Sequence, residues 1–134
     1  MPEPKYQFSE RSLANLDTCH PLLQDLFHEV IKHFDCTVIE GHRTRERQME
    51  LFHAGQSKLM WPNSKHNRDP SWAVDVVPYP IDWNDTEMFY YFGGFVKGTA
   101  KQMGINLRWG GDWDGDNTFV DQSFHDLPHF ELLT

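Results

Sequence analysis

The sequence has 134 residues, of which 39% are hydrophobic and 14% aromatic, a composition typical of one globular domain and not of a disordered chain. Its formal net charge of −8 argues against a nucleic-acid partner, because affinity for a phosphate backbone comes largely from Lys and Arg. The N-terminus lacks the apolar core of a secretory signal, and no later stretch is apolar enough to span a membrane. We therefore expect a single domain over residues 1–134, monomeric, made in the cytoplasm and without membrane insertion.

The first half of the chain predicts a helix, a strand and a second helix. Apolar residues at helical spacing over 20–34 form one stripe that packs on a core. Residues 36–41 are typical of a short strand ended by glycine, and Thr44 can cap a helix that runs to Gly55.

The middle of the chain predicts a long loop followed by a buried strand. Residues 56–72 have no hydrophobic period, and a loop of this length in a compact domain is usually functional. The loop contains His66. The short apolar run 73–77 suits a buried strand, but it is interrupted by the carboxylate of Asp75, which needs an explanation.

The last third predicts one more helix and two strands. Asp85 or Thr86 can cap a helix over about 86–103, and residues 106–109 and 130–133 have the composition of strands. The predicted fold class is therefore α+β, with a small, mainly antiparallel sheet and helices packed on it.

His28 and His33 resemble the H-E-x-x-H zinc helix but have one residue too many between them. Five helical steps turn the second side chain roughly 140° from the first, whereas four would leave it about 40° away. The two histidines therefore cannot share a metal ion on a regular helix.

A better metal-binding set is spread along the chain as His66, Asp75 and His129. Two imidazoles and one carboxylate are the ligands of a catalytic zinc site with one position open to water. Each residue alone has an ordinary alternative, which stays open: a solvated loop histidine, a salt-bridged aspartate and a histidine that caps the sheet after Pro128.

Asp126 stands three residues before His129, just ahead of the last predicted strand. A carboxylate beside a metal-bound water can take its proton and pass it to the leaving amine, which is what peptide hydrolysis needs. This position favours a hydrolytic site over a structural one.

Five short motifs carry a resemblance to a known family. They are Gly41-His-Arg-Thr44, Ser64-Lys-His66, Ala73-Val-Asp75, Trp109-Gly-Gly-Asp-Trp113 and Asp126-Leu-Pro-His-Phe-Glu-Leu132. With them in this order, most of the chain resembles the zinc peptidases that include VanY-type D-alanyl-D-alanine carboxypeptidases and phage endolysins that cut the L-alanyl-D-glutamate bond. The resemblance implies a Hedgehog/DD-peptidase-like fold.

The resemblance also implies roles for individual residues. His66, Asp75 and His129 would be the zinc ligands, and Asp126 the general base. Arg43 would act in catalysis by binding a substrate carboxylate or carbonyl, a task suited to its planar fork of donors, although a helix-start surface charge remains the alternative. Ser64, in the Ser-x-His motif, is a further expected substrate-binding residue.

One departure from the family lies between the first two expected ligands. The family usually has S-x-H-x-x-G-x-A-x-D, whereas here the spacing from His66 to Asp75 is two residues longer and lacks the glycine. Because both anchoring ends are intact, we expect the ligand geometry to survive. Asp69, within the insertion, is a rival ligand.

A second departure is the acidic insert that follows Trp113. Asp112, Asp114 and Asp116 have the alternating spacing of a calcium loop, but Asn117 stands where such loops have glycine and no Glu stands at position twelve. A bound Ca²⁺ and a solvated acidic loop are both compatible with this insert.

The preferred interpretation is a phage endolysin that cleaves the L-alanyl-D-glutamate bond of the peptidoglycan stem peptide. It would wait in the host cytoplasm without a signal peptide and reach the wall once another phage protein opens the membrane. The same residues would serve a D-alanyl-D-alanine carboxypeptidase, although such enzymes normally need export or an anchor. A non-catalytic zinc-binding module has no need of Asp126, and a calcium-binding wall-recognition domain rests on the acidic insert alone.

Overall fold

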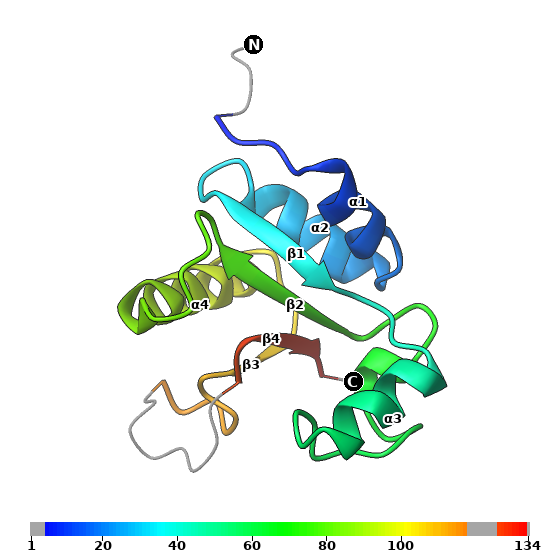
Figure 1. The fold of residues 1–134 in the computed structure, drawn as a ribbon. Helices are drawn as coiled ribbons and strands as arrows, with labels where there is room; N and C mark the ends of the chain where they lie inside the picture. The colour runs from blue at the N-terminus through cyan, green and yellow to red at the C-terminus, as the bar shows by residue number, and fades with distance from the viewer. Residues whose placement is uncertain (1–4, 118–125, 134) are drawn as a thin grey trace.

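The computed structural model describes residues 5–117 and 126–133, which form four α-helices, one 3-10 turn and four strands. In chain order they are α1 (Glu10–Asp17), α2 (Pro21–Val30), β1 (Cys36–Glu40), α3 (Arg45–His53), η1 (Lys65–Asn67), β2 (Ala73–Pro78), α4 (Thr86–Gln102), β3 (Leu107–Gly110) and β4 (Asp126–Leu132). The strands form one sheet in the order β1-β2-β4-β3, and every neighbouring pair is antiparallel (Figure 1). The predicted α+β class with a small antiparallel sheet is confirmed.

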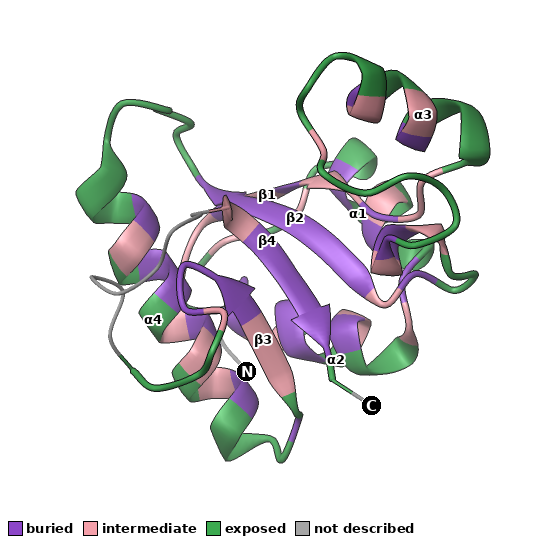
Figure 2. Ribbon diagram, turned by 90° about the horizontal axis from the view of Figure 1, so that it is seen from below, coloured by how far each residue is buried: buried purple, intermediate pink, exposed green. Residues whose placement is uncertain are grey.

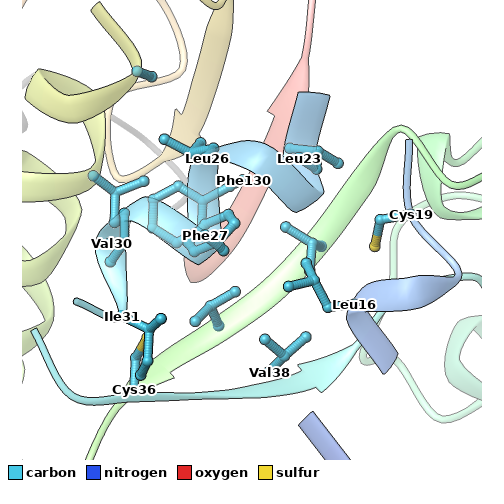
Figure 3. Packing of buried hydrophobic residues seen from close by; sticks show 14 of the residues in the cluster. Leu16, Cys19, Leu23, Leu26, Phe27, Val30, Ile31, Cys36, Val38 and Phe130 are labelled. Carbon is cyan, nitrogen blue, oxygen red and sulfur yellow. The ribbon is translucent and has the colours of Figure 1, made fainter. Parts of the chain in front are cut away.

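The hydrophobic core lies between one face of the sheet and helices α1, α2 and α4. Successive side chains of a strand point to opposite faces, so Val74 and Val76 of β2 enter the core together with Phe130 of β4. Phe27 of α2 meets Phe130 edge to face, with ring centroids 5.5 Å apart (Figure 3). This packing fixes β2 and β4 at the centre of the sheet.

The same alternation sends a second set of side chains to the other face. Asp75 lies between the core residues Val74 and Val76, and His129 precedes the core residue Phe130. Strand β2 is buried along its whole length (Figure 2). The carboxylate of Asp75 is therefore held out of water on the face opposite the core, where a partner must compensate its charge.

A β-bulge near the end of β1 changes the direction of one side chain. Val38 pairs with Val76, but Glu40 pairs with Asp75, so Ile39 is an extra residue on β1. Cross-strand partners share a face of the sheet, and Glu40 therefore lies on the Asp75 side instead of the core side.

The helices differ in part from the sequence prediction. Thr44 caps α3 as expected, with its Oγ1 accepting a hydrogen bond from Arg47 N at 3.1 Å, and Asp85 caps α4. Helix α2 ends at Val30, four residues earlier than predicted. Helix α1 was not predicted, because its buried residues are only Ser12 and Leu16, too few for a clear apolar stripe.

The loop and the last strand also have features beyond the prediction. The long loop of residues 56–72 contains the 3-10 turn η1, and β4 begins at Asp126 instead of at Phe130. Residues 118–125 of the acidic insert lie outside the described part of the chain. Within 5–117 and 126–133, no helix has the length and apolar character that crossing a bilayer requires.

Candidate active site

Two of the expected metal ligands face each other across the centre of the sheet. Asp75 of β2 and His129 of β4 are directly paired in the antiparallel register. His129 Nδ1 lies 3.3 Å from Asp75 Oδ1, and both residues are 7% exposed. Strand pairing alone thus brings together two residues that are 54 positions apart in the sequence.

The third expected ligand, His66, is positioned by the turn η1. Ser64 caps this turn, with its Oγ accepting a hydrogen bond from His66 N at 3.2 Å. His66 Nδ1 lies 2.7 Å from the carbonyl oxygen of Gly41, and its Nε2 lies 3.2 Å from Asp75 Oδ1. A carbonyl only accepts, so Nδ1 carries a proton and a neutral His66 directs the lone pair of Nε2 towards Asp75.

His129 is oriented by the same principle with its nitrogens exchanged. Its Nε2 lies 2.8 Å from Glu131 Oε1, so the proton belongs on Nε2 and the lone pair of a neutral ring on Nδ1. Nδ1 is the atom that faces Asp75. With neutral rings, both imidazoles would present an unprotonated nitrogen to a metal ion beside Asp75 Oδ1, whereas in the metal-free protein a proton on these nitrogens makes the hydrogen bonds to that oxygen.

The three ligand atoms fit a divalent metal of zinc size. Tetrahedral coordination at about 2.0–2.1 Å from Zn²⁺ places ligand atoms about 3.3 Å apart. The distances from Asp75 Oδ1 are 3.2 Å to His66 and 3.3 Å to His129, and all three ligand atoms lie within 4.8 Å of one another. The group is buried, and its donor set of two nitrogens and one carboxylate oxygen suits Zn²⁺.

The other oxygen of Asp75 is held by Arg43. Arg43 Nη2 donates to Asp75 Oδ2 at 3.2 Å, Nη1 donates to Gln48 at 3.2 Å, and Nε lies 3.1 Å from Glu40 Oε2. Burial by itself would raise the pKa of Asp75, but the charges and hydrogen bonds of His66 and His129 hold it well below its usual range. Asp75 is therefore ionised and ready to bind a cation.

Asp126 stands next to this group without joining it. Its Oδ2 lies 3.9 Å from His129 Nδ1, and its side chain is 38% exposed, against 10% for Asp75. Burial raises the pKa of Asp126, and repulsion from Asp75 raises it further. A carboxyl group so placed can accept a proton near the metal position.

The group of His66, Asp75 and His129 lies beside a cleft of about 240 Å³. Its charged and metal-binding lining comprises Arg43, Lys58, Lys65, His66, Arg108, Asp126, His129 and Glu131. Trp113 also lines it and tilts against His129, with ring centroids 5.5 Å apart. The cleft gives a peptide access to the metal position from the solvent side of the sheet.

The structure brings the expected site residues together with one exception. Arg43 and Ser64 both line the cleft, although Arg43 also contacts Asp75 and Ser64 also caps the His66 turn. The rival ligand Asp69 is exposed and lies outside the metal-binding group. The insertion that contains it is anchored by Trp72, whose ring lies under the guanidinium of Arg68 at 4.4 Å.

Glu131 and Glu40 are site residues that the sequence reasoning did not single out. Glu131 is 6% exposed and contacts His129, Arg108 and Lys65. Its position two residues after a strand histidine, and hence on the same face, was the available signal. Glu40 gave no such signal, because only the bulge in β1 brings it to Arg43.

The acidic insert forms a second cluster on the far side of β3. Carboxylate oxygens of Asp112, Asp114 and Asp116 lie within 4.8 Å of one another. Asp112 Oδ2 already accepts hydrogen bonds from Lys97 Nζ at 2.7 Å and Asn117 N at 2.9 Å. Its Oδ1 is buried and accepts no hydrogen bond within the described residues.

The chain is similar to known proteins in both sequence and fold. Residues 5–133 match the family described as phage L-alanyl-D-glutamate peptidase. The L-alanyl-D-glutamate peptidase of Escherichia phage T5 is 31% identical over 137 residues, which cover 96% of this chain and 98% of that protein. The crystal structure of the Serratia marcescens L-Ala D-Glu endopeptidase ChiX is similar with a TM-score of 0.75 and 29% identity, covering 96% of this chain and 92% of that one. Sequence and fold therefore point to the same group of proteins.

Proposed function

The chain belongs to the phage L-alanyl-D-glutamate peptidase family, and from this premise we propose that it hydrolyses the L-alanyl-D-glutamate bond of peptidoglycan at a zinc site. The observation that carries the proposal is the convergence of His66 Nε2, Asp75 Oδ1 and His129 Nδ1 beside an open cleft. A site of three protein ligands leaves a coordination position for water, as catalytic zinc sites do.

Bound zinc would supply an acidic water and a polarised scissile carbonyl. Asp126 takes the proton of the attacking water on its carboxylate, and it then passes this proton to the nitrogen of the leaving D-glutamyl amine. Asp126 is suited to both steps, because it lies 3.9 Å from His129 Nδ1 and is solvent-accessible enough to meet a substrate.

Arg43 has two roles in this proposal. It holds Asp75 Oδ2, which keeps Oδ1 directed at the metal. A guanidinium carries five N–H groups, and Nη1 and Nη2 of Arg43 each donate one hydrogen bond, to Gln48 and Asp75, so each keeps one N–H for a substrate carbonyl or carboxylate. Ser64 can contribute its hydroxyl proton from the floor of the same cleft.

The test is mass spectrometry of purified muropeptides incubated with the protein, with zinc, with a chelator, and with the Asp126→Ala variant. Fragments split between L-Ala and D-Glu that disappear on chelation and in the variant are the expected result. Release of terminal D-Ala alone would identify a carboxypeptidase instead. No cleavage by a folded, zinc-loaded protein would identify a binding module.

We also propose that Asp112, Asp114 and Asp116 bind Ca²⁺. The buried, unbonded Oδ1 of Asp112 supports this, since Ca²⁺ takes six to eight oxygen ligands and a buried carboxylate oxygen usually has a partner. Millimolar Ca²⁺ should raise the melting temperature, and the Asp114→Asn, Asp116→Asn double variant should lose this response. No shift in the unmodified protein would leave the cluster as a solvated acidic loop paired with Lys97.

A further inference from the structure

A second pocket, of about 290 Å³, adjoins the metal cleft at Asp126. It is lined by Trp83, Thr86, Phe89, Asp126, Leu127 and Pro128. Of the residues that the structure describes, Asp126 alone lines both spaces, so the pocket and the cleft meet at the proposed general base. A substrate bound across the metal position would extend into both.

The pocket contains an exposed but well-supported aromatic surface. The indole of Trp83 is 58% exposed, and it stacks on Phe89 of α4 with ring centroids 5.5 Å apart and an interplanar angle of 23°. Phe89 itself is only 3% exposed. The buried phenyl ring therefore supports one face of the indole, while much of the indole remains available to a ligand.

The two spaces differ sharply in charge. Among the described residues that line the pocket, Asp126 alone titrates. The cleft on the other side of Asp126 is lined by Arg43, Lys58, Lys65 and Arg108, against the carboxylate of Glu131. A substrate with one neutral and one acidic end would bind in one direction only.

The peptidoglycan stem has this asymmetry about the L-alanyl-D-glutamate bond. On the C-terminal side, the γ-linked D-glutamate and the residues after it carry free carboxylates. On the N-terminal side, the lactyl carboxyl is consumed in the amide to L-alanine, so the N-acetylmuramyl-L-alanyl part is uncharged. Its pyranose ring also presents a face of C–H groups that can lie on the electron-rich face of an indole.

We propose that the Trp83–Phe89 pocket binds the N-acetylmuramyl-L-alanyl end of the substrate, with the acidic end of the stem peptide lying towards Lys65 and Arg108. This inference rests on the proposed function, since it assigns the two sides of the same scissile bond. Trp83 is then a specificity-determining residue that distinguishes a glycan-linked stem from a free peptide.

The test is binding of the N-terminal cleavage product to the zinc-loaded protein, measured by calorimetry. N-acetylmuramyl-L-alanine should bind about tenfold more tightly than N-acetyl-L-alanine, the gain expected of one aromatic stacking contact. Trp83→Ala should remove this preference, and Trp83→Phe should keep much of it. Tyr91→Ala is the matched control, because Tyr91 lies on α4, is 67% exposed and does not line the pocket.

The same variants can be compared in hydrolysis of two substrates, the muramyl tripeptide and its N-acetyl tripeptide counterpart. Trp83→Ala should lower kcat/KM about tenfold on the first and leave the second unchanged. Equal binding of N-acetylmuramyl-L-alanine and N-acetyl-L-alanine by the unmodified protein would overturn the assignment. A preference for the first that survives Trp83→Ala would also overturn it. If Trp83→Ala weakened binding of γ-D-glutamyl-diaminopimelate, the acidic end of the substrate would lie in the Trp83–Phe89 pocket, and this result would also overturn the assignment. Product binding without any hydrolysis would instead contradict the proposed function alone.

Discussion

Glu131 Oε1 lies 2.8 Å from His129 Nε2, while Nδ1 of the same ring lies 3.3 Å from Asp75. Arg108 and Lys65 in turn hold Glu131 Oε2, at 2.7 Å and 3.2 Å. A carboxylate bonded to the outer nitrogen of a metal-binding imidazole fixes its tautomer and raises its basicity. Glu131 therefore couples two cations at the cleft to the orientation of one proposed metal ligand.

Glu131→Gln should weaken zinc binding about 10- to 100-fold, the usual effect of losing such a carboxylate. The amide oxygen can still accept the Nε2 proton, but the charge beside the ring is lost and the amide NH2 group can no longer accept from Arg108 or Lys65. Competition with a chromogenic chelator measures the affinity. Glu50→Gln is the control, because Glu50 is 69% exposed and its ion pair is with Arg47, away from the metal position. Equal zinc affinities for the two variants would contradict the role given to Glu131.

Asp126→Asn should lower kcat by about 10² to 10⁴, the range for loss of a general base, and leave the zinc affinity within a few-fold of normal. The reason is that Asp126 lies beside the metal-binding group and is not one of the three convergent ligands. Steady-state hydrolysis and zinc titration of the same preparation separate the two effects. A variant that keeps its turnover would show that another group takes the proton.

The metal-free protein should lose stability on both sides of a window between about pH 4.5 and pH 6.5. Burial by itself would lower the pKa of His129, but hydrogen bonds with Asp75 and Glu131 raise it from 6.5 to about 9. The protonated ring therefore stabilises the folded state. This contribution is complete below pH 6.5 and is lost as the pH rises through 9. Burial by itself would raise the pKa of Glu131, but its hydrogen bond and charge interaction with His129 lower it from 4.5 to about 2. The ionised carboxylate therefore stabilises the folded state, and this contribution is lost as the pH falls below 4.5.

Zinc should remove the alkaline part of this profile, because a metal-binding histidine is already neutral. Thermal melts of chelated and zinc-loaded protein from pH 4 to pH 10 compare the two states. Glu131→Gln should also reduce the alkaline loss, since one cause of the raised His129 pKa is gone. A chelated protein whose melting temperature is constant between pH 6 and pH 9 would contradict this account.

Gly110→Ala should impair catalysis and also lower stability. Gly110 pairs with Asp126, and a Cβ at this position would clash with the backbone carbonyl of Asp126, so the proposed base must move. Gly98→Ala on α4 is the matched control, because nothing lies within 4 Å of the place that its Cβ would occupy and alanine should stabilise a helix by about 0.5–1 kcal/mol. Comparing kcat with the melting temperature for both variants tests the prediction, and full activity of Gly110→Ala would contradict it.

Local signals predicted much of the fold. Thr44 and Asp85 before helices and the apolar run around Asp75 each produced the expected element, because caps and short apolar runs act within a few residues. The start of β4 was placed four residues late, because Pro128 and the register shift opposite Gly110 interrupt the strand pattern. Helix α1 was missed because packing of few residues against β1, and not its own periodicity, holds it.

The sequence by itself determined the family and which residue types could hold a metal, since both are carried by short motifs. Only the tertiary structure decided how those residues act together. The antiparallel register sets Asp75 opposite His129, and Arg43, which lies 32 positions before Asp75, holds the second oxygen of its carboxylate. Such contacts join residues far apart in the chain, and their geometry depends on strand register and packing, which no local pattern specifies.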